Sequence, residues 1–175
     1  MVRVAWVPFE LHPETPVEGV PRETYFGRAR SEQMHNRLRL VAEEVGLSME
    51  PRDVIINSRR ALGAAEFARE HGKFEEMHNA LFKAHWERTA KLDNVDDLVR
   101  IGAGIGLDGD DLRRAIEQGR YEQLIDDSRH EAESVGINAI PAHVFGRRYL
   151  IVGAQPYEAF RRVVDRLKEE AQSLS

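Results

Sequence analysis

Two short hydrophobic runs near the C-terminus, Ala142–Phe145 and Tyr149–Val152, are the clearest strand signals in the chain. Both contain the β-branched and aromatic residues that favour strands, and Gly146-Arg147-Arg148 between them is a turn signal. Pro141 stands directly before the first run, where a residue that cannot donate a ladder hydrogen bond is tolerated. The pattern therefore predicts a β-hairpin that starts at Pro141 and is closed by Gly153.

A second strand pattern lies at the N-terminus. Along Val2–Val7, valine and tryptophan alternate with other residues at a period of two, which is typical of a strand. Pro8 ends this pattern, and the following segment to Pro16 has the proline spacing of an extended loop. We therefore expect one strand, Val2–Val7, followed by irregular chain.

Helical periodicity fills the region between these strands and also follows the hairpin. The predicted helices are 21–45 (broken near Gly27 and ended by Gly46), the segment from Ala61 that ends at His71-Gly72, 74–86, 95–106, 112–119, 121–135 and 155–174. The first carries an apolar series at helical spacing, and residues 47–56 connect it to the next. Asn57 or Ser58 is expected to cap that next helix, and aspartates mark the later helix starts.

Composition limits the function classes. The chain has 175 residues, of which 42% are hydrophobic, so it can form one domain with a real core, with or without an inserted subdomain. The net charge of −5 comes from interspersed acids and bases, which argues against nucleic-acid and membrane-surface binding. No apolar run approaches the roughly 20 residues of a membrane span, and no signal peptide is apparent. We therefore expect a cytoplasmic protein.

The sequence contains no cysteine. This removes disulfides, thiolate metal ligands and thiol nucleophiles together. Whatever reaction or binding event the chain supports, it performs no dithiol chemistry of its own.

Three motifs carry a resemblance to a known family. They are GINAIPAHVFGRRYLIVGAQPYEAFRRVV near the C-terminus, WVPFELHPETP near the N-terminus, and the run HNALFKAHW between them. Their order and spacing resemble the DsbA-like thioredoxin superfamily, and within it the FrnE-type branch of dithiol-disulfide oxidoreductases and isomerases. The resemblance covers essentially the whole chain.

The resemblance implies an α/β fold, thioredoxin-like with a large all-helical insertion. Residues 1–20 and 136–175 would form the thioredoxin-like part, and residues 21–135 the helical insertion. In this family a first strand and a first helix carrying a C-P-W-C motif precede the strand that matches Val2–Val7. That segment has no counterpart here, so the expected fold lacks its first strand and first helix.

The same resemblance supplies the candidate site. It implies a cis Ile140–Pro141 peptide bond in a loop, with Ala139, Ile140 and Pro141 binding the main chain of a substrate. Asn57 matches a family position near the active-site face, although helix capping is the favoured interpretation of this residue. No residue can be assigned a catalytic role, and no cofactor is expected. His143 occupies a strand position that is usually apolar in the family.

A metal site is not favoured. His78 and His85 are seven residues apart on one predicted helix face, with Glu75 one turn earlier, whereas helical metal sites usually use ligands three or four residues apart. The EF-hand spacing and a nucleotide-binding glycine loop are also missing. These histidines are better explained as polar residues between packed helices.

Three functions remain open. In the first, the chain is a redox-inactive DsbA-like domain that binds a peptide, a small thiol or a partner at its cis-proline groove. Alternatively, it is a glutathione-using isomerase of the 2-hydroxychromene-2-carboxylate isomerase type, although that family places its catalytic serine in the segment without a counterpart. In the third case it is part of a longer, active oxidoreductase.

Loss of the central strand and the first helix further predicts a homodimer that buries the uncovered sheet face. In that dimer Val2–Val7 could also slide to pair with Ala142–Phe145.

Overall fold

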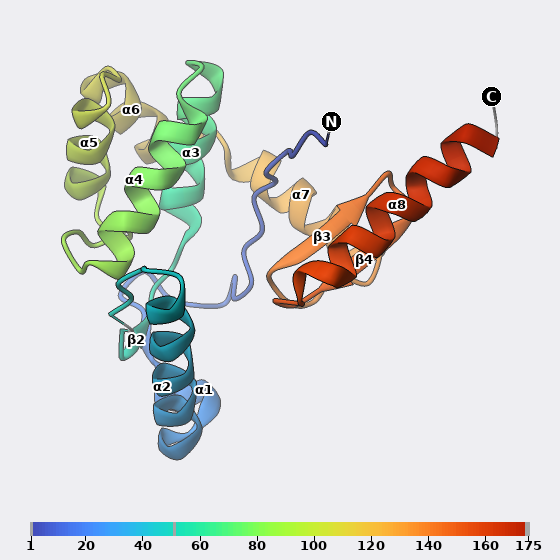
Figure 1. Cartoon of the computed structure of the whole chain (residues 1–175). Helices are drawn as coiled ribbons and strands as arrows, with labels where there is room; N and C mark the ends of the chain where they lie inside the picture. Colours follow the sequence, from blue (N-terminus) through green and yellow to red (C-terminus); the bar gives the residue numbers. More distant parts are fainter. Residues whose placement is uncertain (1, 51, 174–175) are drawn as a thin grey trace. The chain divides into compact units, whose positions relative to one another are not determined.

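The computed structural model describes residues 2–50 and 52–173 and divides into two compact units (Figure 1). One unit extends to Ser128 and the other starts at Arg129. The elements in chain order are β1 Val20–Pro21, α1 Arg22–Phe26, α2 Arg28–Glu44, β2 Val54–Ile55, α3 Arg59–Glu70, α4 Phe74–Trp86, α5 Val95–Gly104, α6 Gly109–Glu117, α7 Glu122–Ser134, β3 Ala142–Phe145, β4 Tyr149–Val152 and α8 Tyr157–Ser173. The helices and the hairpin agree closely with the sequence-based prediction.

Glycines end the early helices as their sequence positions predict. Gly27 separates α1 from α2 at a φ of 73°, and Gly46 follows α2 at a φ of 71°. These left-handed conformations are cheap for glycine and costly for other residues. The expected break and the expected end of the first helical region are therefore both confirmed.

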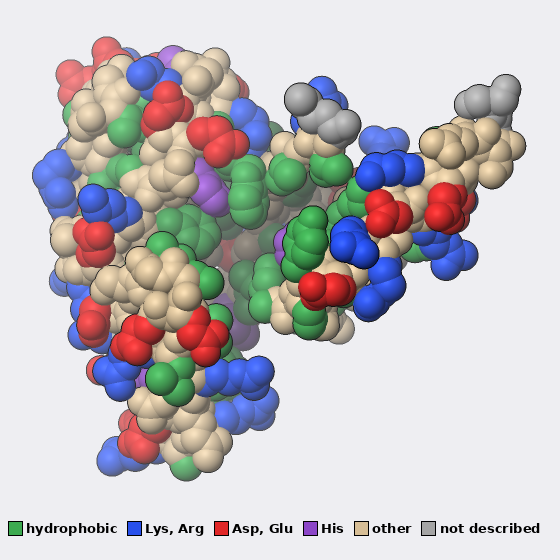
Figure 2. Space-filling model, viewed as in Figure 1, with side chains coloured by type: hydrophobic (Ala, Val, Ile, Leu, Met, Phe, Trp, Pro, Cys, Tyr) green, Lys and Arg blue, Asp and Glu red, His purple; other side chains and the backbone are tan. Residues whose placement is uncertain are grey.

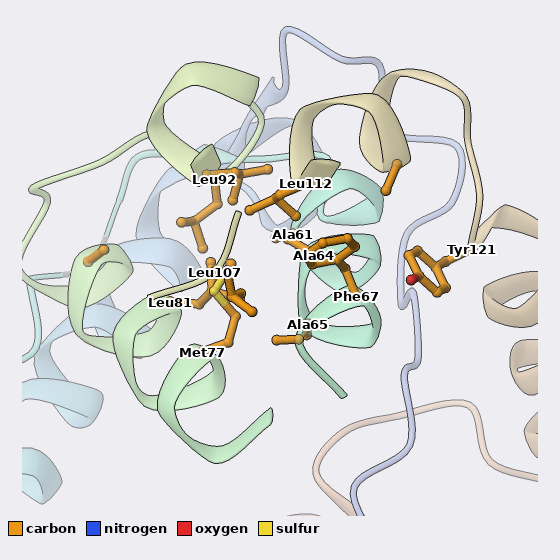
Figure 3. Packing of buried hydrophobic residues seen from close by; sticks show 14 of the residues in the cluster. Ala61, Ala64, Ala65, Phe67, Met77, Leu81, Leu92, Leu107, Leu112 and Tyr121 are labelled. Carbon is orange, nitrogen blue, oxygen red and sulfur yellow. The ribbon is translucent and has the colours of Figure 1, made fainter. Parts of the chain in front are cut away.

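The core of the first unit is built around α3. This helix packs against α4, α5 and α6, and its alanines allow the neighbouring helices to approach closely (Figure 3). Phe67 from α3, Met77 from α4, Leu98 from α5 and Leu112 from α6 are fully buried. Burial of side chains of this size is worth roughly 1.5–3 kcal/mol each, so this cluster stabilises the helical unit.

A short sheet that the sequence did not suggest lies next to this core. Val20 and Pro21 of β1 pair antiparallel with Ile55 and Val54 of β2. Arg22 strengthens the pairing, because its backbone N–H donates to Asp53 and its side chain donates to the carbonyl oxygen of Arg52. The segment from 47 to 56, expected as a connector, thus contains one strand of a two-stranded ladder.

The expected strand at Val2–Val7 is not formed. Residues 2–7 have no strand conformation, and their side chains are exposed. A strand needs a neighbour to satisfy its backbone N–H and C=O groups, and β3 pairs only with β4 within the described chain. Val2–Val7 does not pair with Ala142–Phe145 within the described chain, and a slide of this segment in a homodimer stays a prediction. Trp6 instead stacks on His78 of α4, with ring centroids 4.5 Å apart.

The apolar series of α2 is also not buried as its periodicity led us to expect. Only Ser31 and Ala42 of this helix are buried, whereas Leu38, Val41 and Val45 are exposed. The helix packs on α1, which is only five residues long and too short to cover it. The amphipathic pattern is therefore present, but its apolar side faces solvent.

In the second unit α8 covers one face of the β3–β4 hairpin. His143 and Phe145 point toward Phe160 of α8, with ring-centroid distances of 4.9 and 6.1 Å. At the far end of the hairpin, the hydroxyl of Tyr149 donates to Glu170, which also forms an ion pair with Arg148 at 2.8 Å. Aromatic contacts at one end and ionic contacts at the other thus fix the helix on the hairpin.

His85 lies near the end of α4, beside the segment that precedes β2. Two donors of the Arg52 side chain reach the carbonyl oxygens of His85 and Ala90, at 3.3 and 2.7 Å. Burial, followed by the positive charges of Arg52 and Arg22, lowers the pKa of His85 from 6.5 to about 4. The imidazole is therefore neutral at physiological pH, and its protonation opposes the folded state.

We expect the free energy of unfolding to fall as the pH is lowered from about 6.5 to about 4, because in this range the unfolded chain binds a proton at His85 that the folded chain does not. In urea unfolding at several pH values, the free energy of unfolding of a His85→Gln variant should depend less steeply on pH than that of the wild type. His130→Gln, at an exposed position, is the matched control for the exchange of a histidine for glutamine. Equal slopes for His85→Gln and wild type would contradict this assignment.

Candidate binding site

The loop before β3 holds three of the four predicted site residues. The Ile140–Pro141 peptide bond is cis. The carbonyl oxygen of Pro141 accepts a hydrogen bond from the backbone N–H of Gly153 at 2.7 Å, which fixes the loop to the end of β4. Ala139 is half-buried, while Ile140 and Pro141 are exposed. The loop is thus held in place from one side and presents its apolar side chains to solvent.

The backbone of β3 has an open edge. Pro141 and Gly153 form a hydrogen-bonded pair of the antiparallel ladder, and such pairs alternate with non-hydrogen-bonded ones. His143 is therefore the next residue bonded to β4, whereas the N–H and C=O groups of Ala142 and Val144 point away from β4. No other described strand pairs with this edge. These backbone groups are free to bind an extended chain.

The face of the hairpin opposite α8 is apolar and uncovered. Val144 and Leu150 are cross-strand neighbours on this face, since side chains alternate along each strand. Val144 is 54% exposed and Leu150 is 41% exposed. Ile140, in the adjoining loop, is 52% exposed. The open edge of β3 therefore lies beside an apolar surface.

His143 does not point toward this uncovered face. Its ring lies edge-on against Phe160, and its buried Nδ1 has no hydrogen-bond partner among the described residues. The polar His143 is accommodated at this strand position by aromatic packing against α8. It places no reactive group beside the Pro141 loop.

Asn57 belongs to the first unit and has a structural task there. Its Oδ1 accepts from the backbone N–H of Arg59, the first residue of α3, at 3.0 Å. Its Nδ2 donates to the carbonyl oxygen of Thr15 at 2.7 Å. The expected capping role is therefore confirmed, although Ser58 is the formal N-cap residue. A contribution of Asn57 to substrate binding stays a prediction.

An ionic cluster around the buried Glu10, at the start of α3, was not anticipated from the sequence. Glu10, whose side chain is 1% exposed, accepts two hydrogen bonds at one oxygen from Arg59, at 3.1 and 2.7 Å. Arg59 also donates to Asp126 of α7 at 2.6 Å. The hydrogen bonds to Asp126 and Glu10 raise the pKa of Arg59, against the opposing effect of burial. One guanidinium thus holds three chain segments together.

The second carboxylate oxygen of Glu10 is buried and has no hydrogen-bond partner among the described residues. The sequence does hold a signal for this cluster. Glu10 lies between Phe9 and Leu11 in a proline-bounded segment, and an acid in such an apolar setting needs a buried cation. The sequence does not say which arginine supplies the charge, because Arg59 lies 49 positions away.

The histidines considered as metal ligands have other partners. His78 packs between Phe74 and Phe82 of its own helix, with ring-centroid distances of 5.5 and 4.7 Å. Across residues 2–50 and 52–173, no group of three or more metal-ligating side chains is arranged to hold an ion. In the same residues no helix is both long and apolar enough to cross a membrane.

A proline-led hairpin followed by a helix, with a helical region between it and the N-terminal segment, defines a thioredoxin-like protein with a helical insertion. The chain belongs to the DsbA-like thioredoxin domain family, whose model matches residues 1–165. It is 25% identical over 169 residues to the uncharacterized protein YwbO of Bacillus subtilis (strain 168). The alignment covers 93% of this chain and 81% of YwbO.

Two solved structures share the fold. A probable DsbA oxidoreductase from Streptomyces coelicolor superposes with a TM-score of 0.83 at 23% sequence identity, over 93% of this chain and 74% of that one. A candidate protein disulfide isomerase from Nitrosomonas europaea gives a TM-score of 0.64 at 16% identity, over 81% and 75% of the two chains. At these identities the similarity establishes the fold.

We expect Arg59→Met to lower the free energy of unfolding by about 3–5 kcal/mol, because it leaves the Glu10 carboxylate buried without its cation. Glu10→Gln should cost less, about 1–3 kcal/mol, since Arg59 keeps Asp126. Urea unfolding of both variants and of the double variant measures the coupling between the two residues. The control is Arg113→Met, which removes an ion pair to the exposed Asp96 and should cost about 0–1 kcal/mol. A cost for Arg59→Met no larger than this control would show that the cluster contributes little.

Proposed function

We propose that this protein is a DsbA-like domain that binds extended polypeptide at the Pro141 loop and the open edge of β3, without dithiol chemistry. The observation that carries the proposal is the pair of outward N–H and C=O groups at Ala142 and Val144, next to an uncovered apolar face. An exposed strand edge binds peptides by adding a strand, with main-chain hydrogen bonds supplying affinity. Within the family, we assign the chain to the FrnE-type branch.

The side chains beside the edge indicate the kind of peptide. Ile140, Val144 and Leu150 are exposed aliphatic residues, and no charged residue lies within β3 or β4. A bound strand would place alternate side chains over this face. The site therefore favours extended segments with aliphatic or aromatic residues at alternate positions, as unfolded polypeptides present them.

Because the sequence has no cysteine, no mixed disulfide with a substrate can form. We expect insulin reduction by dithiothreitol and the refolding of a scrambled disulfide protein to proceed at the rate of buffer alone. Measurable acceleration by a metal-free preparation of this chain would contradict the proposal. An in-frame C-P-W-C codon run in the upstream DNA would instead identify this domain as the binding part of an active oxidoreductase.

Strand addition predicts a specific backbone requirement. NMR titration with a cysteine-free hexapeptide of alternating valine and threonine should shift the amide signals of residues 140–145. Val144→Pro removes the outward N–H without breaking a bond to β4, so it should weaken binding at least tenfold. Val144→Thr keeps the N–H and is the matched control, expected to stay within about threefold of wild type.

Two results would argue against this mode. Equal binding by Val144→Pro and Val144→Thr would exclude hydrogen bonding at the β3 edge. A response to glutathione, but not to the hexapeptide, would favour the glutathione-using isomerase type over a peptide-binding domain.

A further inference from the structure

The exposed side of α2 has the spacing of a coiled-coil seam. Met34, Leu38, Val41 and Val45 follow one another at intervals of four, three and four residues, which places them in one stripe along the helix. Met34 is half-buried, and the other three are exposed. A stripe of this kind is the surface through which one amphipathic helix packs on another.

A basic and an acidic residue flank the stripe. Arg37 and Glu44 are seven residues apart, so they lie on the same flank of the stripe, one toward each end of it. Both side chains are exposed, and neither forms an ion pair with any residue in the part of the chain that the structure describes. Figure 2 shows acidic, basic and hydrophobic side chains together on the surface of this segment.

We propose that this stripe binds the α2 helix of a second copy of the chain in an antiparallel pair about a twofold axis. In that register Leu38 packs against Val41 of the partner subunit, and Met34 packs against Val45 of the partner subunit. The same register sets Arg37 opposite Glu44 of the partner subunit. The twofold axis repeats each contact, so the two copies share two apolar layers on either side of the axis and two ion pairs.

The charge pattern selects the antiparallel pair. In a parallel pair the residue that flanks Arg37 is Ala42 of the partner subunit, five positions along, and both charges stay unpaired. In the antiparallel pair Arg37 meets Glu44 of the partner subunit twice, at two points related by the twofold axis on the same flank of the stripe. This charge complementarity commits the surface to a second copy of the same helix, because the helix supplies both the acid and the base that it needs.

The size of the surface sets the strength of the association. A 17-residue helix is about 25 Å long, and the stripe along it presents three exposed aliphatic side chains. This is small compared with the interface of a stable dimer. We therefore expect a dimer that forms at high micromolar concentration and dissociates on dilution. It differs from the dimer through the sheet face that the sequence suggested, and it does not depend on peptide binding at β3.

Sedimentation velocity across a concentration series tests the pairing. The wild type should shift from monomer to dimer with rising concentration, and Val41→Arg should weaken the association at least tenfold. Leu40→Gln is the control, because Leu40 is also an exposed aliphatic residue of this helix, lies outside the stripe, and glutamine adds no charge beside Glu44. It should associate like the wild type. Circular dichroism of each variant verifies that the fold is retained.

Charge reversal tests the register. Arg37→Glu and Glu44→Arg should each weaken the dimer, and the double variant R37E/E44R should restore it, since only the antiparallel pair exchanges these two positions. A wild type that stays monomeric up to millimolar concentration would overturn the proposal. So would a dimer that Val41→Arg leaves intact. Failure of the double variant to recover, when both single variants are weakened, would overturn the antiparallel register.

Discussion

The first unit depends on one half-buried guanidinium, which pairs with a fully buried carboxylate. Arg59 holds the otherwise irregular segment that contains Glu10 against the start of α3, and it reaches Asp126 of α7 at the same time. Two further hydrogen bonds act in the same place, from Asn57 to Thr15 and from Ser128 to Pro8. The N-terminal segment thus has a defined path without being part of any sheet, because polar side chains replace the ladder bonds that a strand would have made.

A second constraint, the pairing of backbone groups between strands, explains why the two small sheets have unpaired edges. Strands satisfy their backbone groups in pairs, and β1–β2 and β3–β4 each provide one partner only. In the family that the chain belongs to, disulfide chemistry requires cysteines, and this sequence has none. What the hairpin retains is the geometry of an edge and a loop anchored through the carbonyl oxygen of Pro141. This geometry does not depend on a thiol, because backbone groups and a proline provide it.

The sequence predicted the local elements well and the pairings poorly. Proline at 141, glycines at 27 and 46 and the hydrophobic periodicity locate the hairpin and the helix ends, because these signals act within a few residues. Val2–Val7 has the alternation of a strand but not the neighbour, and alternation alone cannot supply one. The partnership of Glu10 with Arg59 and the β1–β2 ladder are long-range outcomes, so the candidate loop could be found by motif while the charge cluster could not.

The second unit differs from the first in how little it buries. Among the described residues from Arg129 onward, Ile137 is the one buried hydrophobic side chain, and α8 contains no buried residue. By contrast, the helices around Phe67 enclose a continuous core. Segments with few buried contacts open at a lower free energy than the rest of a protein. The hairpin and α8 therefore form a separate unit of local unfolding, in which amide protons exchange with solvent while the helical core stays protected.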